Sequence, residues 1–422
     1  PNRSFLYNYA NNYSISPPEK STNKTLAIYV IDLNKFKEVN DTMGHMVGDE
    51  LLKTIAKRLL NLQQEKAIAV RFGGDEFVFW CDDISLNDSI KFAQKIVKTC
   101  AEPFSFNNFT FESSVSVGIS HYRSGHFNLH EMLKNADIAM YQAKKHRLGY
   151  QVFEQHLSEY SSYKLKLRGR LNQAIQQDEF VLFYQPKVKL TTGKIIGLEA
   201  LVRWQHPVEG LLAPLEFIDL IEQSVSVHEF TRYVIRHAIK QSKSWLKQGI
   251  EVPISVNISP HNLMDPMLVS YLSQQLSSHS LPASLIEIEL TETSSMVNIE
   301  QTQKVFSQLK DIGVCVSIDD FGTGMSSLAY VKQLDVDIIK IDRSFVSDVS
   351  FNDNDEAIIA SILLLCQKLN KTTVAEGVES QEQAEKLIEL GCDIGQGYYY
   401  SRPLPVDEIT TILADSYSSE MS

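Results

Sequence analysis

The chain has 422 residues, of which 43% are apolar and 22% are charged, and its formal net charge is −12. This length exceeds one ordinary domain and the composition is typical of a soluble globular protein, so we expect two domains. Because no run of lysine or arginine compensates the acidic balance, a nucleic-acid polymer is disfavoured as a partner, and the carboxylates are expected to hold cations instead.

Five cysteines, odd in number and without close-paired spacing, predict reduced core residues of a cytosolic protein and no disulfide framework. The longest apolar run, 357–366, is too short to cross a membrane, and no signal peptide is recognisable. These features predict a cytoplasmic chain. It begins Pro1-Asn2-Arg3 without a methionine, so we expect a fragment whose upstream part is missing.

Residues 26–33 (LAIYVIDL) predict a buried strand that ends on Asp32. A loop over 44–49 is then expected to open an amphipathic helix over 50–62. Asp49 stands where the N-cap of that helix is expected, and capping does not exclude a second use of its carboxylate.

A hairpin is predicted from 67–72 and 77–81, turned by Gly73-Gly74-Asp75-Glu76. A Gly-Gly turn alone would be structural. A turn that places Asp75 beside the end of the Asp32 strand makes a two-carboxylate metal site, next to a glycine backbone that phosphates can approach.

The pattern then reads helix 88–101, strand 109–120, helix 129–145 and strand 150–153, which predicts a compact α+β palm. Metal-bound carboxylates on a palm suit phosphoryl transfer. Lys144, at the end of its helix, either meets a triphosphate or is a solvated lysine.

Leucines among charges predict a connecting helix over 155–170, which continues over 171–180 before a first barrel strand at 181–186. From there one unit repeats: a short apolar run, a polar residue and a helix. This repeat predicts a (β/α)8 barrel, whose strands all end on one rim where catalytic side chains converge. The predicted strand ends carry Glu199, Asn257, Glu289, Asp319, Lys340 and Glu376, and Gln396 is expected in the turn Gly395-Gln396-Gly397.

Asp319 and Asp320 are adjacent carboxylates after an apolar run. Two like charges side by side repel each other, so the pair is favourable where a cation neutralises both. The alternative is that Asp319 ends the strand and Asp320 starts a turn. The other acidic strand ends favour the metal.

Two family resemblances follow from these motifs. Residues 1–154 resemble the diguanylate cyclase family with the GGDEF motif, intact here as Gly73-Gly74-Asp75-Glu76-Phe77, and 171–422 resembles the EAL family of cyclic-di-GMP phosphodiesterases through Glu199-Ala200-Leu201. The resemblance implies a nucleotidyl-cyclase-like α+β palm with a central mixed sheet, truncated at its N-terminus, then the connecting helix 155–170 and an α/β (β/α)8-type barrel. Pro1-Asn2-Arg3 is similar to the end of the cyclase entry motif, which implies an upstream sensory region.

In the cyclase-like half the resemblance implies a GTP site. Asp32 and Asp75 match Mg²⁺ ligands, and the remaining matches to the GTP site are Asn40, Asp49, Gly73, Gly74, Glu76 and Lys144, with Asn40 and Asp49 reading guanine and Lys144 contacting phosphate. The sequence also departs from the family. Asp32-Leu33-Asn34 replaces Asp-x-Asp, the phosphate arginine near 147 is lost or shifted, and the inhibitory Arg-x-x-Asp is absent at 64–67, so feedback inhibition is not expected.

In the EAL-like half the resemblance implies two Mg²⁺ or Mn²⁺ ions. Their ligands would be Glu199, Asn257, Glu289, Asp319, Asp320 and Glu376. Lys340 would sit beside the attacking water, so the catalytic set is Glu199, Asp319, Asp320, Lys340 and Glu376. Glu292 would steady the Asp320–Gly324 loop, and Gln185, Arg203 and Gln396 would contact substrate.

The first hypothesis is hydrolysis of cyclic-di-GMP to linear pGpG, with a GTP-binding half that regulates the barrel or is conditionally active. The second is a bifunctional enzyme whose dominant activity makes cyclic-di-GMP from two GTP, which requires a homodimer. The third is a non-catalytic cyclic-di-GMP receptor. Whichever holds, the full-length protein could be anchored to a membrane through its missing N-terminal region.

Overall fold

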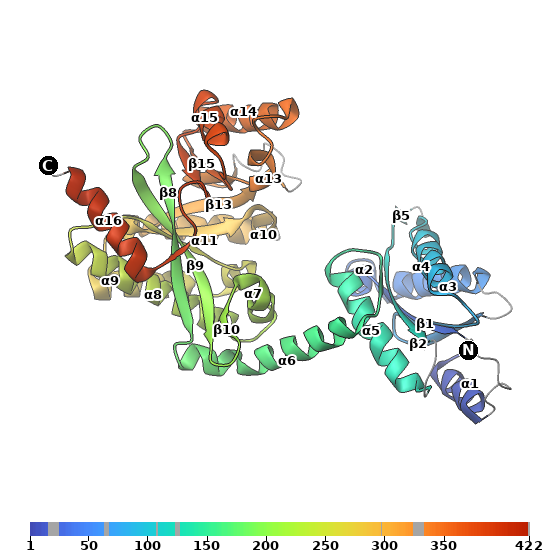
Figure 1. Ribbon diagram of the computed structural model, residues 1–422. Helices are drawn as coiled ribbons and strands as arrows, with labels where there is room; N and C mark the ends of the chain where they lie inside the picture. Colours follow the sequence, from blue (N-terminus) through green and yellow to red (C-terminus); the bar gives the residue numbers. More distant parts are fainter. Residues whose placement is uncertain are drawn as a thin grey trace. The chain divides into compact units, whose positions relative to one another are not determined.

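The computed structural model describes residues 1–15, 25–62, 67–106, 109–122, 127–296, 298–323 and 333–420. The chain divides into two compact units, Pro1–Leu165 and Lys166–Ser422 (Figure 1). The division falls inside helix α6 (Gln155–Gln176). None of the helices in the described ranges has both the length and the apolar character that a membrane span requires.

The first unit is built on a mixed sheet of strand order β2-β3-β1-β6-β7, in which β1 pairs antiparallel with β3 and β6, and β6 pairs parallel with β7. Its elements are α1 (Arg3–Ile15), β1 (Leu26–Leu33), α2 (Phe36–Met43), α3 (His45–Asn61), β2 (Ala67–Gly73), β3 (Glu76–Asp82), α4 (Leu86–Cys100), β4 (Phe104–Phe106), β5 (Phe109–Phe111), β6 (Val115–Tyr122), α5 (Leu129–Lys145) and β7 (Tyr150–Val152).

Strand β1 is buried on both faces because helices cover both sides of the sheet. Tyr29 and Ile31 join the core under α3 and α4, while Ile28 and Val30 join the core under α5. This alternation follows from the period of two along a strand. The predicted palm with a central mixed sheet is confirmed.

Two sequence-based boundaries in this unit are wrong. Helix α3 begins at His45, with Gly44 at the N-cap position, so Asp49 lies inside the helix and is not its cap. The strand predicted over 109–120 is two strands, because β5 pairs only with β4 in a separate hairpin and the polar residues 112–114 separate it from β6.

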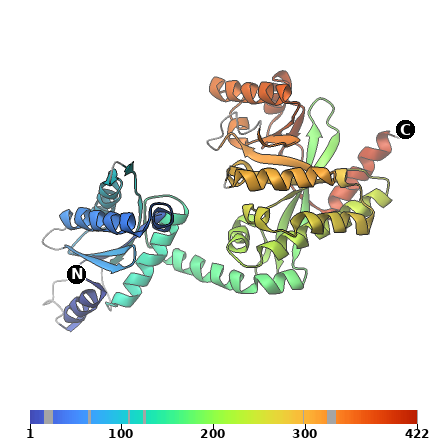
Figure 2. The same cartoon turned by 180° about the vertical axis from the view of Figure 1, so that it is seen from behind.

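The second unit is an eight-stranded barrel with helices outside it. Its elements are β8 (Phe180–Lys189), β9 (Ile195–His206), β10 (Gly210–Leu212), α7 (Pro214–Glu222), α8 (Val227–Lys247), β11 (Ile254–Asn257), η1 (Pro260–Met264), α9 (Leu268–His279), η2 (Ala283–Leu285), β12 (Ile286–Thr291), α10 (Glu292–Met296), α11 (Ile299–Asp311), β13 (Cys315–Phe321), β14 (Ile338–Ile341), α13 (Arg343–Val346), α14 (Asp353–Lys368), β15 (Thr372–Glu376), α15 (Gln381–Glu389), β16 (Ile394–Gln396), β17 (Leu404–Pro405) and α16 (Val406–Glu420). Helices α8, α11 and α14 pack against β11, β13 and β15, and their yellow to orange ribbons cover the outside of the strands in Figure 2.

The barrel confirms the predicted (β/α)8-type fold, with one difference in strand direction. Strands β9, β11, β12, β13, β14, β15 and β16 are parallel neighbours, whereas β8 closes the barrel antiparallel to both β9 and β16. The expectation that all strands end on one rim therefore fails for β8. It enters at the end of the barrel where the others finish.

Strands β8 and β9 form a long antiparallel ribbon, drawn in green in Figure 1. In this ribbon Gln185 lies opposite Glu199, so Glu199 is in the middle of β9 and not at its end. Pairing with β8 supports β9 as far as Trp204, and β10 pairs with its last residues up to His206, which an apolar pattern does not reveal.

The end of α6 is tied to the start of β8. Arg170 donates to both carboxylate oxygens of Glu179, at 2.5 and 3.1 Å, and the Trp204 indole N–H donates to the same carboxylate at 2.9 Å. A bidentate ion pair of this kind fixes the relative orientation of the two side chains as well as their distance. The five cysteines, elsewhere in the fold, are unpaired thiols, and four of them are buried.

Candidate active site in the barrel and candidate nucleotide site in the first unit

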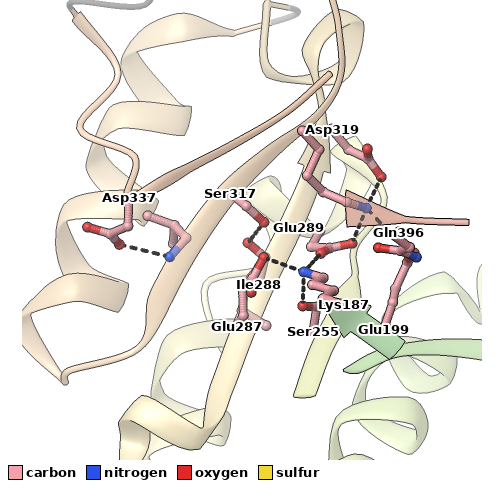
Figure 3. Close-up of polar contacts among 12 residues, drawn as sticks. Lys187, Glu199, Ser255, Glu287, Ile288, Glu289, Ser317, Asp319, Asp337 and Gln396 are labelled. Carbon is pink, nitrogen blue, oxygen red and sulfur yellow. Dashed lines mark hydrogen bonds and ion pairs between the residues drawn. The ribbon is translucent and has the colours of Figure 1, made fainter. Parts of the chain in front are cut away.

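Lys340 stands at the centre of the barrel site. Its side chain is fully buried, and its Nζ lies 2.7 Å from Glu376, 3.0 Å from Glu289, 3.0 Å from Asp319 and 3.4 Å from Glu199. The four carboxylates come from β15, β12, β13 and β9, so the barrel brings together residues up to 177 positions apart in the sequence. Figure 3 shows Glu199, Glu289 and Asp319 converging.

The carboxylates form two groups that could each hold a cation. Glu199, Glu289 and Asp319 offer ligand atoms within 4.8 Å of one another, and so do Asp319, Asp320 and Glu376. Asp319 belongs to both groups. Two neighbouring ions with one bridging carboxylate is the arrangement that the geometry permits.

Amide side chains hold Glu199 from both sides. Asn257 donates to its Oε1 at 2.7 Å, and Gln396 donates to its Oε2 at 2.6 Å and to Gln185 at 3.2 Å. The Oε1 of Gln396 is buried and has no hydrogen-bond partner among the residues that the structure describes. A buried acceptor without a donor is a place for a ligand group or an ion.

Burial and neighbouring charges both shift the pKa values of the residues in this site. Burial raises the pKa of Glu199 and Glu376, since the Lys340 charge only partly offsets their lost hydration. Burial alone would raise the pKa of Glu289 too, but Lys187 and Lys340 outweigh it and lower the pKa. Burial would likewise lower the pKa of Lys340, and the surrounding carboxylates instead raise it well above its ordinary value.

Asp319 and Asp320 both lie within β13, which continues to Phe321, so the strand does not end at Asp319. The Thr323 N–H and hydroxyl donate to the Asp320 carbonyl, so a turn does begin at Asp320, as the alternative has it. Asp320 has a φ of 55°, a left-handed conformation that is unusual for a residue other than glycine. Its backbone N–H donates to Asp319 at 2.8 Å. Burial, with Asp319 and Asp342 nearby, raises the pKa of Asp320 to about 6.

Glu292 is fully buried at the start of α10 and accepts a hydrogen bond from the Gly322 N–H at 2.6 Å. Its carboxylate thus meets the segment that follows Asp320. Gly324, the last residue of the predicted loop, lies outside the described residues, as do positions 64–66 of the predicted inhibitory motif in the first unit.

A cavity of about 250 Å³ opens above Glu199, Asp320, Glu376 and Gln396. Gln185 also lines it, but Arg203 does not: its guanidinium donates to the Val202 carbonyl and lies 5.4 Å from the Phe183 ring centre. Sequence reasoning missed several lining residues, namely Leu201, Asp342, Arg343, Glu379 and Tyr398. Of these, Asp342 and Arg343 carry a signal, because they follow the Lys340 strand directly.

The first unit brings its predicted carboxylates to one sheet edge. Asp32 lies opposite Glu76 across β1 and β3, and Asp75 occupies the adjoining turn. Lys144 reaches from α5 to Asp32 at 2.5 Å, so the alternative of a merely solvated lysine is wrong. Burial, followed by the charges of Asp137, Asp32 and Asp75, raises the pKa of Glu76.

Helices α2 and α3, which carry Asn40 and Asp49, pack together where Asn40 approaches Gly48. A Cβ at Gly48 would fall 2.0 Å from the Asn40 Oδ1, so only glycine permits this approach. The glycine turn is shaped by Arg71, which donates to the Gly74 carbonyl at 2.8 and 3.1 Å, with Gly73 exposed and Gly74 at a φ of 44°.

The fold and the two sites define a class: a mixed-sheet palm with an acidic glycine turn, joined to a barrel whose mouth gathers carboxylates in the way that divalent-cation enzymes do. Two family models match the chain. The EAL domain model covers residues 168–403, and the model described as "Diguanylate cyclase, GGDEF domain" covers residues 1–148. The chain belongs to the family of tandem GGDEF and EAL proteins.

Curated relatives cover nearly all of the chain. It is 37% identical over 392 residues to the cyclic di-GMP phosphodiesterase NbdA of Pseudomonas aeruginosa, which covers 92% of this chain and 50% of that protein. It is 38% identical over 394 residues to the bifunctional diguanylate cyclase/cyclic di-GMP phosphodiesterase MucR of the same species, covering 93% and 57%. The chain therefore spans about half the length of these relatives.

Solved structures agree with the fold. The PaMucR phosphodiesterase in complex with c-di-GMP is 39% identical with a TM-score of 0.56, and the match covers 58% of this chain and 99% of that one. The S helix-GGDEF-EAL part of Vibrio cholerae LapD, bound to c-di-GMP, has a TM-score of 0.64 and covers 94% and 93%; at 22% identity it supports the fold alone.

Proposed function

We propose that the barrel hydrolyses cyclic-di-GMP to linear pGpG with the help of two divalent cations. The observation that carries the proposal is the pair of carboxylate groups sharing Asp319 around buried Lys340. Relatives at 37% and 38% identity over more than 90% of the chain carry phosphodiesterase names, which supports the substrate class.

The residues fit a pair of hard cations. Glu199, Asn257, Glu289 and Asp319 would hold one ion, with Asp320 and Glu376 completing the second position. Carboxylate and amide oxygens suit Mg²⁺ or Mn²⁺, and neither carboxylate group in the described residues includes a cysteine or histidine that would favour zinc. When bound, such ions supply Lewis acidity and a water of lowered pKa.

Charge balance supports two ions. Six buried or half-buried carboxylates, the two groups of the site together with Glu287, face two ammonium groups among the residues that the structure describes, Lys187 and Lys340. If all were ionised, four negative charges would remain, which two divalent cations would neutralise. Concentrated unpaired charge in a barrel interior is costly without such compensation.

Individual residues of the barrel would have separate roles in the reaction. Lys340 keeps one positive charge where the reacting phosphodiester carries negative charge. Gln185 and Gln396, which line the cavity, would contact the substrate, and Arg203 would do so after leaving the Val202 carbonyl. Glu292 would keep the segment after Asp320 in place through Gly322.

Product chromatography after incubation with cyclic-di-GMP and Mg²⁺ or Mn²⁺ tests the proposal. The wild-type chain is expected to form pGpG, and Glu199→Ala to abolish turnover. Glu209→Ala, which changes an exposed glutamate outside the cavity, serves as the matched control and should behave as wild type. Unchanged hydrolysis by the Glu199 variant would contradict the proposal, and absence of turnover by the wild type would favour a receptor that only binds.

A second candidate function concerns the first unit, which we propose binds GTP with Mg²⁺ and regulates the barrel or makes cyclic-di-GMP conditionally. The Asp32–Lys144 pair and the Asn40–Gly48 contact favour it. One such site would hold one GTP, so synthesis requires a homodimer, with dimerisation governed by an upstream sensory region. Radiolabelled GTP incubated with Glu199→Ala is the test, since product accumulates there; no cyclic-di-GMP leaves only the regulatory role.

A further inference from the structure

A second lysine lies deeper in the barrel than Lys340. Lys187 belongs to β8, and its side chain is 4% exposed. Its Nζ lies 2.5 Å from the Ser255 Oγ, 2.6 Å from the Glu289 Oε1 and 3.0 Å from the Glu287 Oε1. Figure 3 shows the four side chains meeting below Asp319. The three partners use all three hydrogens of the ammonium group.

The reversed direction of β8 places Lys187 there. Residues two apart on a strand share a face, so Ser255 and Glu287 lie one step deeper than Asn257 and Glu289 on their parallel strands. On antiparallel β8 the deeper step after Gln185 is Lys187. Because β8 runs inward from the mouth of the barrel, Lys187 lies deeper than Gln185, which lines the cavity.

Small side chains make room for this lysine. Gly197 lies opposite Lys187 in the ribbon, and a Cβ at Gly197 would already contact the Lys187 Cδ at 3.6 Å. On the neighbouring strands, Ser255 of β11 lies opposite Glu287, and Ser317 of β13 lies opposite Glu289. Barrel interiors are ordinarily filled by branched apolar residues, so this polar layer departs from the usual packing.

Glu289 is held by a different lysine at each oxygen. Its Oε1 meets Lys187 at 2.6 Å and its Oε2 meets Lys340 at 3.0 Å, and its side chain is fully buried. One oxygen is therefore occupied from inside the barrel, and the other faces the carboxylate groups of the mouth. The orientation of this carboxylate is fixed by the lysine beneath it.

We propose that Lys187 is a positioning residue that anchors Glu289 so that its Oε2 faces the cation site, and that Lys187 thereby sets the affinity of the barrel for divalent cations. The inference rests on the proposed cation-dependent function and adds a residue outside the predicted ligand set. Partners that orient metal ligands commonly change metal affinity by about 10- to 100-fold when they are removed.

The sign of the effect separates this role from plain electrostatics. A lysine near a cation site repels the cation, so removing Lys187 for its charge alone should tighten cation binding. Removing an anchor should weaken it, because Glu289 loses its orientation. A purely structural lysine would change stability and leave cation affinity unaltered.

The test is Mn²⁺ binding by isothermal titration and electron paramagnetic resonance on the full chain. We expect Lys187→Met to weaken Mn²⁺ binding about 10- to 100-fold. Ser255→Ala, which removes another Lys187 partner without changing the charge and leaves the Lys187–Glu289 contact in place, is the matched control and should change affinity less than about threefold by comparison with that range. Equal or tighter binding by Lys187→Met would overturn the inference.

Two further variants keep the test decisive. If Lys187→Met fails to fold, Lys187→Met/Glu287→Met removes the buried pair together and still lacks the anchor, so it should bind Mn²⁺ as weakly. Lys187→Gln retains one donor and should recover part of the affinity. The proposed function alone fails if the wild type binds Mn²⁺ but does not hydrolyse cyclic-di-GMP, and the Lys187→Met variant binds Mn²⁺ more weakly. A wild type that binds no Mn²⁺ would overturn both the proposed function and the role of Lys187.

Discussion

Each unit sets a lysine against carboxylates, but the two settings differ in burial. Lys340 has an exposure of 0% and contacts four carboxylates, whereas Lys144 is 44% exposed and contacts Asp32 alone. The barrel site is therefore assembled before any ligand arrives. The site of the first unit is open, and under the proposed function a nucleotide and a second copy would complete it.

Energetics follow the same division. An exposed ion pair contributes about 0–1 kcal/mol, whereas removing one partner of a buried pair costs about 3–5 kcal/mol because the other charge stays behind. Equivalent lysine substitutions should thus have unequal effects in the two units, and measuring both tests the comparison.

Lys340→Met should have the largest effect. It removes the ammonium group that four carboxylates share, and of these Glu289 keeps a second partner, Lys187. We expect hydrolysis to fall by about 10²- to 10³-fold, the usual cost of losing one preorganised charge. We also expect a loss of stability of about 3–5 kcal/mol in the cation-free protein. Single-turnover hydrolysis and urea unfolding measure the two effects, and a variant with near-normal turnover would contradict a role for this charge.

Gly48→Ala should come next, and it acts on the first unit only. The new methyl group would overlap the Asn40 Oδ1, so one of the helices α2 and α3 must shift. Overpacking of this kind costs about 1–3 kcal/mol. GTP affinity, followed by equilibrium binding, should fall, while hydrolysis of cyclic-di-GMP measured without GTP stays unchanged. Gly169→Ala, at a position with open space, is the control.

Asp320 gives the barrel site a pH dependence. Its pKa of about 6 is above the ordinary value, so it gains a proton as the pH falls through 6 and then competes with cations. Mn²⁺ affinity should drop by up to about tenfold between pH 7 and pH 5, and Asp320→Asn should flatten that profile. Because the folded-state pKa is raised, protonation itself stabilises the cation-free protein between about pH 6 and pH 4.

Lys144→Met should have the smallest effect on stability, below about 1 kcal/mol, because its pair with Asp32 is exposed to water. It should nevertheless weaken GTP binding, since the lysine is placed to meet a phosphate. A stability loss as large as that of Lys340→Met would erase the distinction between the two sites.

The helices and strands that the sequence predicts most accurately are those whose ends are marked by a local residue pattern. Helix α5 matches its predicted range, because Asn128 caps it and Lys144 and Lys145 end it. The strand ends that carry Asn257 and Glu376 are equally clear in the sequence, since an apolar run stops at a polar residue in each. The turn predicted at Gln396 is wrong, because Gln396 ends strand β16.

Features that depend on distant pairing were not predictable. The direction of β8, the length of β9 and the contact between Lys187 and Glu287, 100 residues apart, all arise from how strands associate. An apolar run carries no information about strand direction. Gly44 has no side chain that could cap a helix, so the sequence predicts the start of α3 five residues too late.

Arg170 and Trp204 together fix the carboxylate of Glu179 at the entry of the barrel. Glu179 directly precedes β8, and that strand runs from the mouth into the interior past Gln185 and then Lys187. The C-terminal end of α6 and the start of the strand that carries Gln185 and Lys187 are therefore held together inside the barrel unit, so the entry of β8 keeps one orientation relative to that helix end.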